Sequence, residues 1–505
     1  MASKRSEPEA LEAKEARFQQ ADRYLALFEE AFDELHTAVI QRIKDPLIYL
    51  RPHADYPRVT ALASGFPTFH EAGYFDERCP RDYVGSIRPR GILAAISPTL
   101  PKIDLPKTAA LASFLRGHDI GKRFDLFFKD NTPYDGQVEG LICSAVERYL
   151  HLFGKNTPLD IKKRERVILP LFFATAFKDL RLRLVVPITL THFETRHFRL
   201  SATASIIRLP QKLQLARARI STIGSGATAG VVGAATHAFV SNGWSLDVES
   251  ITDVHRSLSR ISADASDTID SFFGALRVAT GVKTGYAQVV WVPQGWALSY
   301  FCDLPPVYGV AVRQYHSEDD NYGWTKNGAT VNAAQLNEVR RIYSGIIENK
   351  SEALRLALRR LNNCLTRADV ADAILDGTIG LELLLGDEEN QSLSYKLRLR
   401  IAALASLHGD PSRSAMEFLG MAKRLYNARS SIVHGLRKRG SKKASGSSEM
   451  KHIDERALAS DLLRFVLNAL LSHPEYRDNP TRIDEELLLR GAKISDRDQE
   501  RISTK

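Results

Sequence analysis

The chain opens with a long stretch of helical periodicity over residues 7–44. Its apolar side chains recur at spacings of three and four, which places them on one face of a helix: Leu25, Phe28, Phe32, Leu35 and Val39. Pro8 suits the first position of such a helix. We predict a single helix whose apolar face packs against a core or a second subunit. Segments broken by proline then alternate with apolar helical ones, so residues 1–160 are predicted to be helix-rich.

The pattern changes between residues 180 and 209, where apolar and polar residues alternate in places. "RLRLVVPITLTHF" and "RHFRLSATASIIRL", with "ETRH" between them, predict the two strands of a hairpin. A glycine-rich connection, "GSGATAGVVGAA", precedes a second predicted strand pair in "YAQVVWVPQGWALSYF", where Pro293 and Gly295 suit a turn. Residues 161–332 are therefore predicted to form a strand-containing α+β region.

After residue 333 the strand patterns stop and apolar residues recur at helical spacing. One of these segments opens with Ser414 and Glu417, which have the spacing of a capping box. Short connections between successive helices predict an antiparallel bundle over residues 333–478. The remaining residues, 479–505, form a charged tail, and the chain after Pro474 is expected to pack loosely. The predicted fold class is α+β: a mixed N-terminal region with antiparallel strands, followed by an all-α bundle.

The composition narrows the class of protein. Hydrophobic residues make up 44% of the chain and charged residues 26%, as in soluble globular proteins. No apolar stretch is long enough to cross a bilayer, and the N-terminus lacks the apolar segment of a secretory signal. The four cysteines are far apart and form no CxxC motif, which predicts reduced thiols, a cytoplasmic protein, and neither structural zinc nor disulfides: Cys79, Cys143, Cys302 and Cys364.

The net charge of +9 and the pI near 9.2 permit a polyanionic partner. Much of the basic charge lies between residues 423 and 451, a stretch that contains nine lysines and arginines but only one acid, Glu449. "RKRGSKKASGSS" has the composition of a solvated loop, but a phosphate-binding role is equally consistent with its position. The candidate RNA-binding residues are Arg437, Lys438, Arg439, Lys442 and Lys443.

An arginine and a histidine lie close together in the stretch "RSSIVHG". On the predicted helix Arg429 stands in an i, i+4 row between Leu425 and Val433, and an arginine among apolar neighbours is seldom unpaired. His434 lies in the last turn before Gly435, a suitable C′ residue. At that end the helix dipole favours the imidazolium, which raises the expected pKa of the histidine toward neutrality.

Two interpretations of this pair stay open at this point. In the structural one, His434 caps an ordinary helix and Arg429 pairs with a buried acid; in the functional one, the two residues act on a phosphate. Glu382, within the apolar "GLELLLG", is the candidate acid, because a carboxylate in such a run is costly unless paired. It is expected either to pair structurally with Arg429, Arg398 or Arg400, or to support a site by orienting Arg429.

Several elements in order carry a resemblance to a known family: "DGTIGLELLLG", "LSYKLRLRIAALAS" and "LYNARSSIVHG" before a final helix. Over roughly residues 335–478 the chain resembles the HEPN superfamily, specifically its ApeA-like branch, and the strand-rich region looks like the amino-terminal part common there. The resemblance implies a metal-independent endoribonuclease that needs no cofactor, with Arg429 and His434 acting on RNA. Ser430 departs from the asparagine, aspartate or histidine that often follows the motif arginine.

The resemblance also implies a homodimer, because two HEPN bundles usually pair so that both motifs line one cleft. It implies a role in phage defence or toxin-like growth arrest. From the architecture alone, we hypothesise that the amino-terminal region senses a trigger or restrains the nuclease. RNA carries its own nucleophile, the 2′-OH, so a histidine that moves protons and a guanidinium that stabilises the phosphate suffice. Five residues separate the two side chains by about 140° around an ideal helix, so a second subunit, a flexible arginine or an unwound helix end must bring them together.

Two other classes compete with the nuclease. One is a non-catalytic bundle that dimerises or binds nucleotides, RNA or proteins with the same residues in structural roles. The other is an HD-type metal phosphohydrolase, since "HDIGK" contains adjacent His118 and Asp119, with His70 and His151 as conceivable further ligands. An ordinary turn explains "HDIGK" more simply. The glycine-rich segment lacks the GxxxxGK[ST] phosphate loop and is interpreted as a flexible connection.

Overall fold

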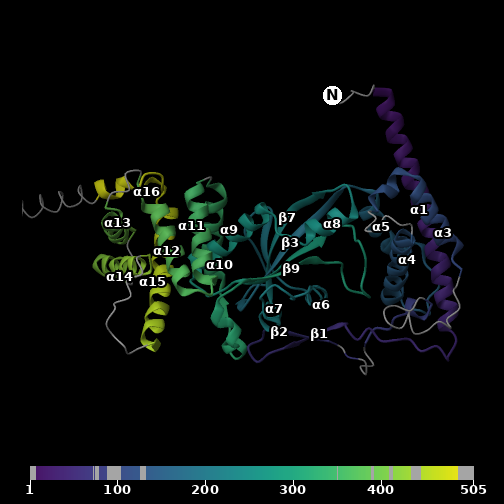
Figure 1. Ribbon diagram of the computed structural model, residues 1–505, viewed down its shortest axis with the longest axis horizontal. Helices are drawn as coiled ribbons and strands as arrows, with labels where there is room; N and C mark the ends of the chain where they lie inside the picture. Colours follow the sequence, from purple (N-terminus) through teal and green to yellow (C-terminus); the bar gives the residue numbers. More distant parts are fainter. Residues whose placement is uncertain are drawn as a thin grey trace, which may run out of the picture.

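The computed structural model describes most of the chain. The described residues are 7–71, 73, 79–87, 104–124, 132–349, 351–387, 392–408, 413–433 and 445–486. The molecule is elongated, with the N-terminal helices at one end, a β-sheet in the middle and a helical bundle at the other end (Figure 1). The α+β fold class is therefore confirmed, with antiparallel strands preceding an all-α C-terminal part.

The described residues of the N-terminal part include four α-helices around a core of their own. These helices are α1 (Glu7–Ile43), α3 (Pro106–Gly117), α4 (Thr132–Phe153) and α5 (Ile161–Ala176). The long first helix is confirmed, and Phe28, Phe32 and Leu35 on its predicted apolar face are fully buried. Helix α5 belongs to this core rather than to the sheet, because Leu171 packs there and Arg164 forms ion pairs with the acids of α1.

A short antiparallel hairpin lies between these helices in sequence and was not predicted. Its strands are β1 (Pro57–Ala61) and β2 (Pro67–Glu71). Both begin with proline, which confines them to short edge pairing and weakens a strand pattern in the sequence. The loop between α1 and β1, which carries His53, connects the N-terminal helices to this hairpin.

The central sheet has six strands in the order β5-β6-β7-β3-β8-β9, and its strand pairs are antiparallel. The strands are β3 (Asp179–Ile188), β5 (His197–Arg199), β6 (Ala204–Arg208), β7 (His237–Asp247), β8 (Tyr286–Pro293) and β9 (Tyr308–Gln314). Two further short strands, β4 (Thr191–Phe193) and β10 (Ala329–Val331), form a separate parallel pair.

Both predicted hairpins are wrong in their pairing. The first region does not fold back on itself: β3 pairs with β7 and β8, and only the short β5 and β6 form a hairpin. In the second region, the turn after β8 does not lead directly into a strand, and β8 pairs with β9, which begins only at Tyr308. The alternation of side chains identified the strands, but pairing depends on contacts between residues far apart in the sequence.

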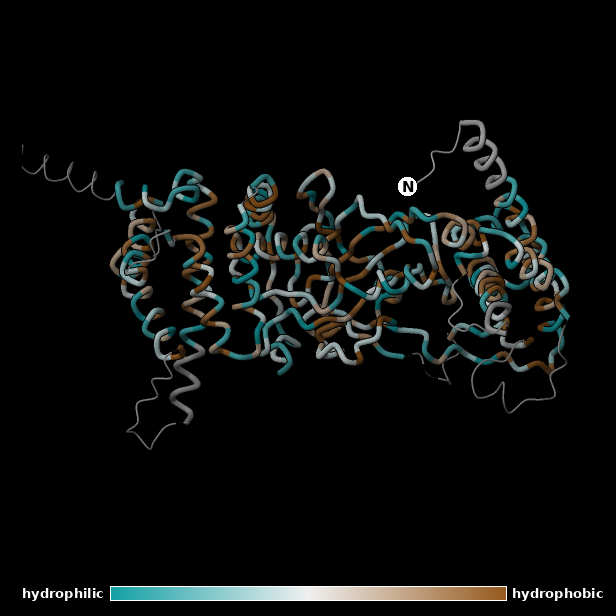
Figure 2. Tube along the Cα trace, turned by 45° about the horizontal axis from the view of Figure 1, so that its top comes forward, coloured by the Kyte–Doolittle hydropathy of each residue, from teal (hydrophilic) through white to brown (hydrophobic). Residues whose placement is uncertain are grey.

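The middle of the sheet is covered on both faces, which explains why β8 and the second half of β3 are nearly continuous in apolar residues. On β3, Leu184 and Val186 face a large core shared with α9 (Ala263–Thr280), whereas Val185 faces a smaller cluster on the opposite side. Other short helices of this part are α6 (Gln211–Arg217), α7 (Ala229–Gly233) and α8 (Ile251–Leu258). In Figure 2, brown hydrophobic segments are seen in the middle of the molecule, where the sheet lies.

The bundle consists of helices that follow β10, as predicted for the residues after 333. They are α10 (Ala333–Glu348), α11 (Glu352–Thr366), α12 (Val370–Leu385), α13 (Leu393–His408), α14 (Ala415–Val433), α15 (Ser445–Ser472) and α16 (Pro474–Asp478). Their core is continuous with that of the sheet, because α9 packs on α11 and the buried Arg277 donates to Asn362 Oδ1 at 2.5 Å. Among the described residues, no helix is both long and apolar enough to cross a membrane.

The chain after Pro474 does not pack loosely as far as it is described. Ile483 is fully buried in the core of the bundle, and Asp484 accepts hydrogen bonds from Arg400, one of 2.7 Å from Nη2. The charged composition of this segment suggested loose packing, but Ile483 is a buried apolar residue and Asp484 is a paired acid. Residues 479–486 are consequently part of the bundle, and the rest of the predicted tail lies outside the described residues.

Candidate functional site on the helical bundle

Three of the predicted site residues, Glu382, Arg429 and Ser430, lie on two neighbouring helices, α12 and α14, which begin at well-formed caps. The side chain of Asp369 accepts from the backbone N–H of Asp372 at the start of α12. At the start of α14, Ser414 and Glu417 form the predicted capping box, with contacts of 2.7 and 3.3 Å. The capping box is confirmed, and the two helices place Glu382 and Arg429 side by side.

Glu382 and Arg429 form an ion pair. Arg429 Nε lies 3.1 Å from Glu382 Oε1, and Nη2 donates a long hydrogen bond of 3.5 Å to Oε2. The Arg429 side chain is 35% exposed and that of Glu382 is 19% exposed. The predicted pairing of Glu382 with Arg429 is confirmed. The ion pair is expected to contribute little to stability, because one of its contacts is long and solvent screens a partly exposed pair.

The surroundings of Glu382 disfavour its charge. Burial raises the pKa of Glu382, and Arg429 only partly opposes that shift. The hydroxyl of Tyr426, one helical turn before Arg429, is buried and has no hydrogen-bond partner among the described residues. Burial also raises the pKa of Tyr426, and the nearby Glu382 carboxylate adds to the effect. The site therefore combines a partly exposed arginine, a carboxylate whose charge is disfavoured by burial, and a phenol hydroxyl that has no hydrogen-bond partner among the described residues.

The other arginines considered for Glu382 have different partners. Arg398 donates from Nε to the carbonyl oxygen of Ser394 at 3.0 Å. Arg400 is fully buried and binds the carboxylates of Asp387 and Asp484. Arg429 is thus the arginine that Glu382 holds.

Beside Glu382 lies a surface pocket of about 820 Å³ whose charges are already paired within the chain. Lys396 and Arg400 both bind Asp387, at 2.9 and 3.0 Å. These pairs leave little net positive charge for a phosphate, so the pocket does not compete with Arg429 as an anion site.

The remaining predicted residues are only partly placed. Ser430 follows Arg429 on α14 and is half-buried. The described part of α14 ends at Val433, so His434 follows it directly but lies outside the described residues. The five basic residues proposed to bind RNA also lie outside them: Arg437, Lys438, Arg439, Lys442 and Lys443. Convergence of Arg429 and His434 stays a prediction.

The HD-like residues are not brought together with further ligands. His118 Nδ1 lies 2.7 Å from the carbonyl oxygen of Phe114, and its ring stacks on the Phe114 ring. Asp119 pairs with Lys122 at 2.6 Å on the surface. Among the described residues, neither His118 nor Asp119 belongs to a cluster of metal-ligand side chains. The structure therefore gives the HD-type hydrolase no support.

Sequence reasoning missed a second cluster of reactive side chains, formed by His53, Glu147, His151 and Cys302. The sequence shows only the i, i+4 spacing of Glu147 and His151, which is common on helices. Comparison with protein-family models, with curated proteins and with solved structures yields no significant match.

The Glu382–Arg429 pair should contribute little to stability. We expect Glu382→Gln to change the free energy of unfolding by less than about 1 kcal/mol, because the pair is partly exposed and burial already disfavours the carboxylate. Urea unfolding followed by far-ultraviolet circular dichroism, which reports the helices of the bundle, measures this change. A loss above about 2 kcal/mol would instead identify the pair as a structural anchor.

Proposed function

We propose that this chain is a HEPN-type endoribonuclease that cleaves RNA without a metal ion, with Arg429 as phosphate stabiliser and His434 as acid/base. The observation that supports this best is the state of Arg429. Its side chain is about a third exposed and forms an ion pair with Glu382, and it lies five residues before His434 in the sequence. Nη1 makes no hydrogen bond to any described residue, so donors remain for a phosphate oxygen.

The proposed reaction uses groups of the RNA and of this chain. The 2′-oxygen attacks the adjacent phosphorus, the bond to the 5′-oxygen breaks, and a 2′,3′-cyclic phosphate and a 5′-hydroxyl result. One histidine accepts the 2′-OH proton, and a second donates a proton to the leaving 5′-oxygen. In a homodimer the two His434 side chains supply both roles, and Arg429 offsets the charge on the phosphate in the transition state.

The proposed homodimer is supported by apolar side chains on the helices that carry the site. The partly or largely exposed ones on α12, α13 and α14 are Leu383, Tyr395, Leu399, Met416 and Val433. Exposed apolar groups gathered on neighbouring helices are typical of surfaces that bind another protein. A second copy of the bundle that packs against some of these side chains would bring two motifs together, as the cleavage chemistry requires. We place this activity in the cytoplasm, in phage defence or growth arrest.

The test compares wild type with Arg429→Ala and His434→Ala on labelled RNA, with and without EDTA. We expect wild type to cleave under both conditions and each variant to lose at least about 100-fold in rate. Arg424→Ala is the matched control, because Arg424 lies on the same helix and is half-exposed. It should retain the wild-type rate, and mass spectrometry of the products should show the cyclic phosphate.

Circular dichroism and gel filtration must first show that the variants fold and assemble normally. Equal cleavage by wild type and the two folded variants would remove Arg429 and His434 from the reaction. Cleavage that stops in EDTA and returns with added Mg²⁺ would contradict the metal-independent mechanism.

A non-catalytic module is the second candidate, and one observation favours it. Glu382 already pairs with Arg429 inside the folded chain, as a structural role for the arginine requires. Binding of RNA by wild type, without cleavage at any protein concentration, would support this module over the nuclease.

A further inference from the structure

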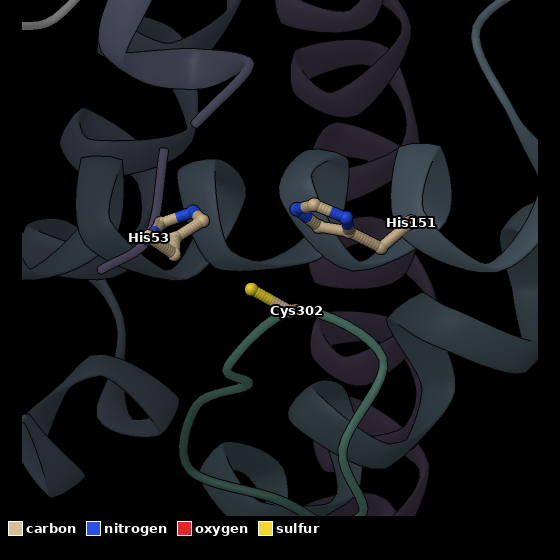
Figure 3. Close-up of side chains that lie close together, drawn as sticks. All are labelled: His53, His151 and Cys302. Atoms are coloured by element: carbon tan, nitrogen blue, oxygen red, sulfur yellow. The ribbon is translucent and has the colours of Figure 1, made fainter. Parts of the chain in front are cut away.

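Three segments far apart in the sequence bring side chains that can bind a metal ion together between the N-terminal helices and the sheet. His53 lies in the loop between α1 and β1, His151 lies on α4, and Cys302 lies in the tight turn after β8. The two imidazoles and the sulfur point toward one another in Figure 3. Their nearest ligand atoms all lie within 4.8 Å of one another.

Glu147 holds the two histidines from one side. Its Oε1 lies 3.3 Å from His53 Nε2 and 2.8 Å from His151 Nε2, so both imidazoles turn the same nitrogen toward the centre. The carboxylate is itself fixed by the backbone N–H groups of Tyr83 and Val84, at 3.2 and 2.8 Å. Glu147 therefore contacts the same nitrogens that face a bound metal ion, so its carboxylate is itself a possible ligand, and metal binding at Nε2 replaces these two hydrogen bonds.

The cluster is largely removed from solvent. The side chains of His53 and His151 are 13% and 7% exposed, and Cys302 is 1% exposed. Cys302 also adopts a left-handed backbone conformation with φ of 49°. That conformation costs a residue with a side chain on the order of 1 kcal/mol, and such strain concentrates at functional sites.

A pocket of about 440 Å³ reaches the cluster from the surface. His53, Glu147 and Cys302 line it, together with Ser144 and Tyr300. The pocket provides a route for an ion and room for a water molecule on the open side of the cluster. A buried set of ligands with an entry path is what a metal site needs.

We propose that this chain binds one Zn²⁺ ion through His53 Nε2, His151 Nε2 and Cys302 Sγ, with Glu147 or a water molecule as the fourth ligand. Two imidazoles and one thiolate suit zinc, which takes nitrogen and sulfur ligands in tetrahedral geometry. Calcium and magnesium require oxygen ligands and are not suited to this set. The site goes beyond the proposed nuclease and lies at the opposite end of the molecule from the bundle (Figure 1).

Metal binding requires a small contraction of the cluster. In a tetrahedral zinc site, bond lengths of about 2.0–2.3 Å place neighbouring ligand atoms about 3.4–3.6 Å apart. The three ligand atoms lie within 4.8 Å of one another, so each pair needs to close by no more than about 1.4 Å. His53 and Cys302 lie in a loop and a turn, which can make this movement, while His151 stays fixed on α4.

Protons leave the site when the metal enters. Cys302 Sγ loses its proton to solvent as the Zn–S bond forms, and each neutral imidazole carries its hydrogen on Nδ1, so that the Nε2 lone pair binds the metal. Burial raises the pKa of the Cys302 thiol, and the nearby Glu147 and Asp303 charges add to this shift. Zinc affinity is consequently expected to fall as the solution is acidified.

A bound ion would join the N-terminal helices to the sheet. Neighbouring contacts already link the same parts: Arg148 on α4 donates to the carbonyl oxygen of Cys302 at 3.1 Å, and Tyr56 donates to Asp303 at 2.8 Å. The ion would cross-link three segments that are otherwise held by hydrogen bonds. We therefore assign the zinc a structural role in this chain.

The competing explanation is a metal-free network in which Glu147 accepts from both histidines and Cys302 is only a buried thiol. The two explanations differ at Cys302, because the network does not use its sulfur. The sequence-based expectation of no zinc rested on the absence of CxxC, a spacing that does not apply to ligands from three separate segments.

The test uses the full chain, stripped of metal and titrated with Co²⁺, a spectroscopic substitute for Zn²⁺. We expect one equivalent to produce the intense visible bands of a tetrahedral site and the ultraviolet band of a cobalt–thiolate bond, and Zn²⁺ to displace the cobalt. Cys302→Ser should abolish the thiolate band and weaken zinc binding by about 100-fold, since even outer-shell partners contribute 10- to 100-fold. Zinc should also raise the melting temperature of wild type but not of this variant.

Cys143→Ser is the matched control, because Cys143 is a buried cysteine that lines the same pocket outside the ligand set. It should keep the thiolate band. If Cys302→Ser does not fold, His53→Ala serves in its place, with the exposed His70→Ala as control, and should lose the tetrahedral bands. Wild type that gives no thiolate band, or a band that survives in Cys302→Ser, would overturn the zinc site in favour of the hydrogen-bond network.

Discussion

Replacing Arg217 with alanine is expected to destabilise the central part of the protein by about 4 kcal/mol or more. Arg217, at the end of α6, is fully buried. It donates from Nη1 to the carbonyl oxygen of Val232 at 2.6 Å and from Nη2 to that of Gly233 at 2.9 Å. Nη1 also donates to Gln288 Oε1 on β8 at 2.9 Å. The residue thus ties α6, the segment around α7 and the sheet together.

The large effect follows from what the substitution leaves behind. Each buried acceptor without a donor costs about 1–3 kcal/mol, and Arg217→Ala leaves several acceptors without a donor at once. The described residues offer Arg217 no carboxylate, so its charge is balanced by carbonyl and amide oxygens alone. Burial lowers the pKa of Arg217 to about 9, which still leaves it charged at neutral pH.

Tryptophan fluorescence during urea unfolding measures this effect where it occurs. The four tryptophans of the chain all lie in the sheet-containing part: Trp244, Trp291, Trp296 and Trp324. Arg260→Ala is the matched control, because Arg260 is exposed, and its effect should stay within about 0.5 kcal/mol. If the two substitutions shift the transition equally, the hydrogen bonds of Arg217 do not hold the central part together.

The second large effect is a loss of stability in acid that depends on His237. This residue, at the start of β7, is only 4% exposed. Burial lowers its pKa to about 4, and the neighbouring charges of Arg208 and His192 act in the same direction, although the hydrogen bond to Thr195 opposes them. Its Nε2 lies 3.2 Å from the Thr195 carbonyl oxygen and its Nδ1 lies 2.9 Å from Thr236 Oγ1, so the neutral ring is fully hydrogen-bonded.

The sign of the effect follows from the lowered pKa. The unfolded chain takes up a proton on this histidine near pH 6.5, whereas the folded protein resists protonation down to about pH 4. The stability that His237 contributes is complete above pH 6.5 and is lost as the pH falls toward 4. A shift of this size corresponds to about 3 kcal/mol.

This prediction is tested by measuring the unfolding free energy of wild type and of His237→Gln, again by tryptophan fluorescence. The measurements are made at pH 7.0 and pH 4.0, which are roughly the two ends of the titration. Glutamine keeps a donor and an acceptor but cannot take up a proton, so the variant should lose about 3 kcal/mol less on acidification than wild type. His70→Gln, at an exposed histidine of β2, should follow the wild-type profile. Identical profiles for wild type and His237→Gln would show that protonation of His237 does not drive the acid transition.

Local patterns predicted the elements better than their partners. The helix over residues 7–44 and the Ser414/Glu417 capping box were correctly predicted, because helical spacing and caps depend on residues within a few positions. The strand patterns of β3 and β8 were recognised too. Their neighbours in the sheet were not, since β7 inserts between β6 and β3 and nothing local specifies that order.

The same division applies to the sites. The sequence by itself determined that Glu382 needs a partner, because a carboxylate in an apolar helix is costly, and Arg429 was among the candidates. Only the tertiary structure decided that Arg429 is the partner, that Ile483 anchors the end of the bundle, and that His53, His151 and Cys302 meet. The physical reason is that burial and caps are properties of one element, whereas a site made by three distant segments exists only after the chain has folded.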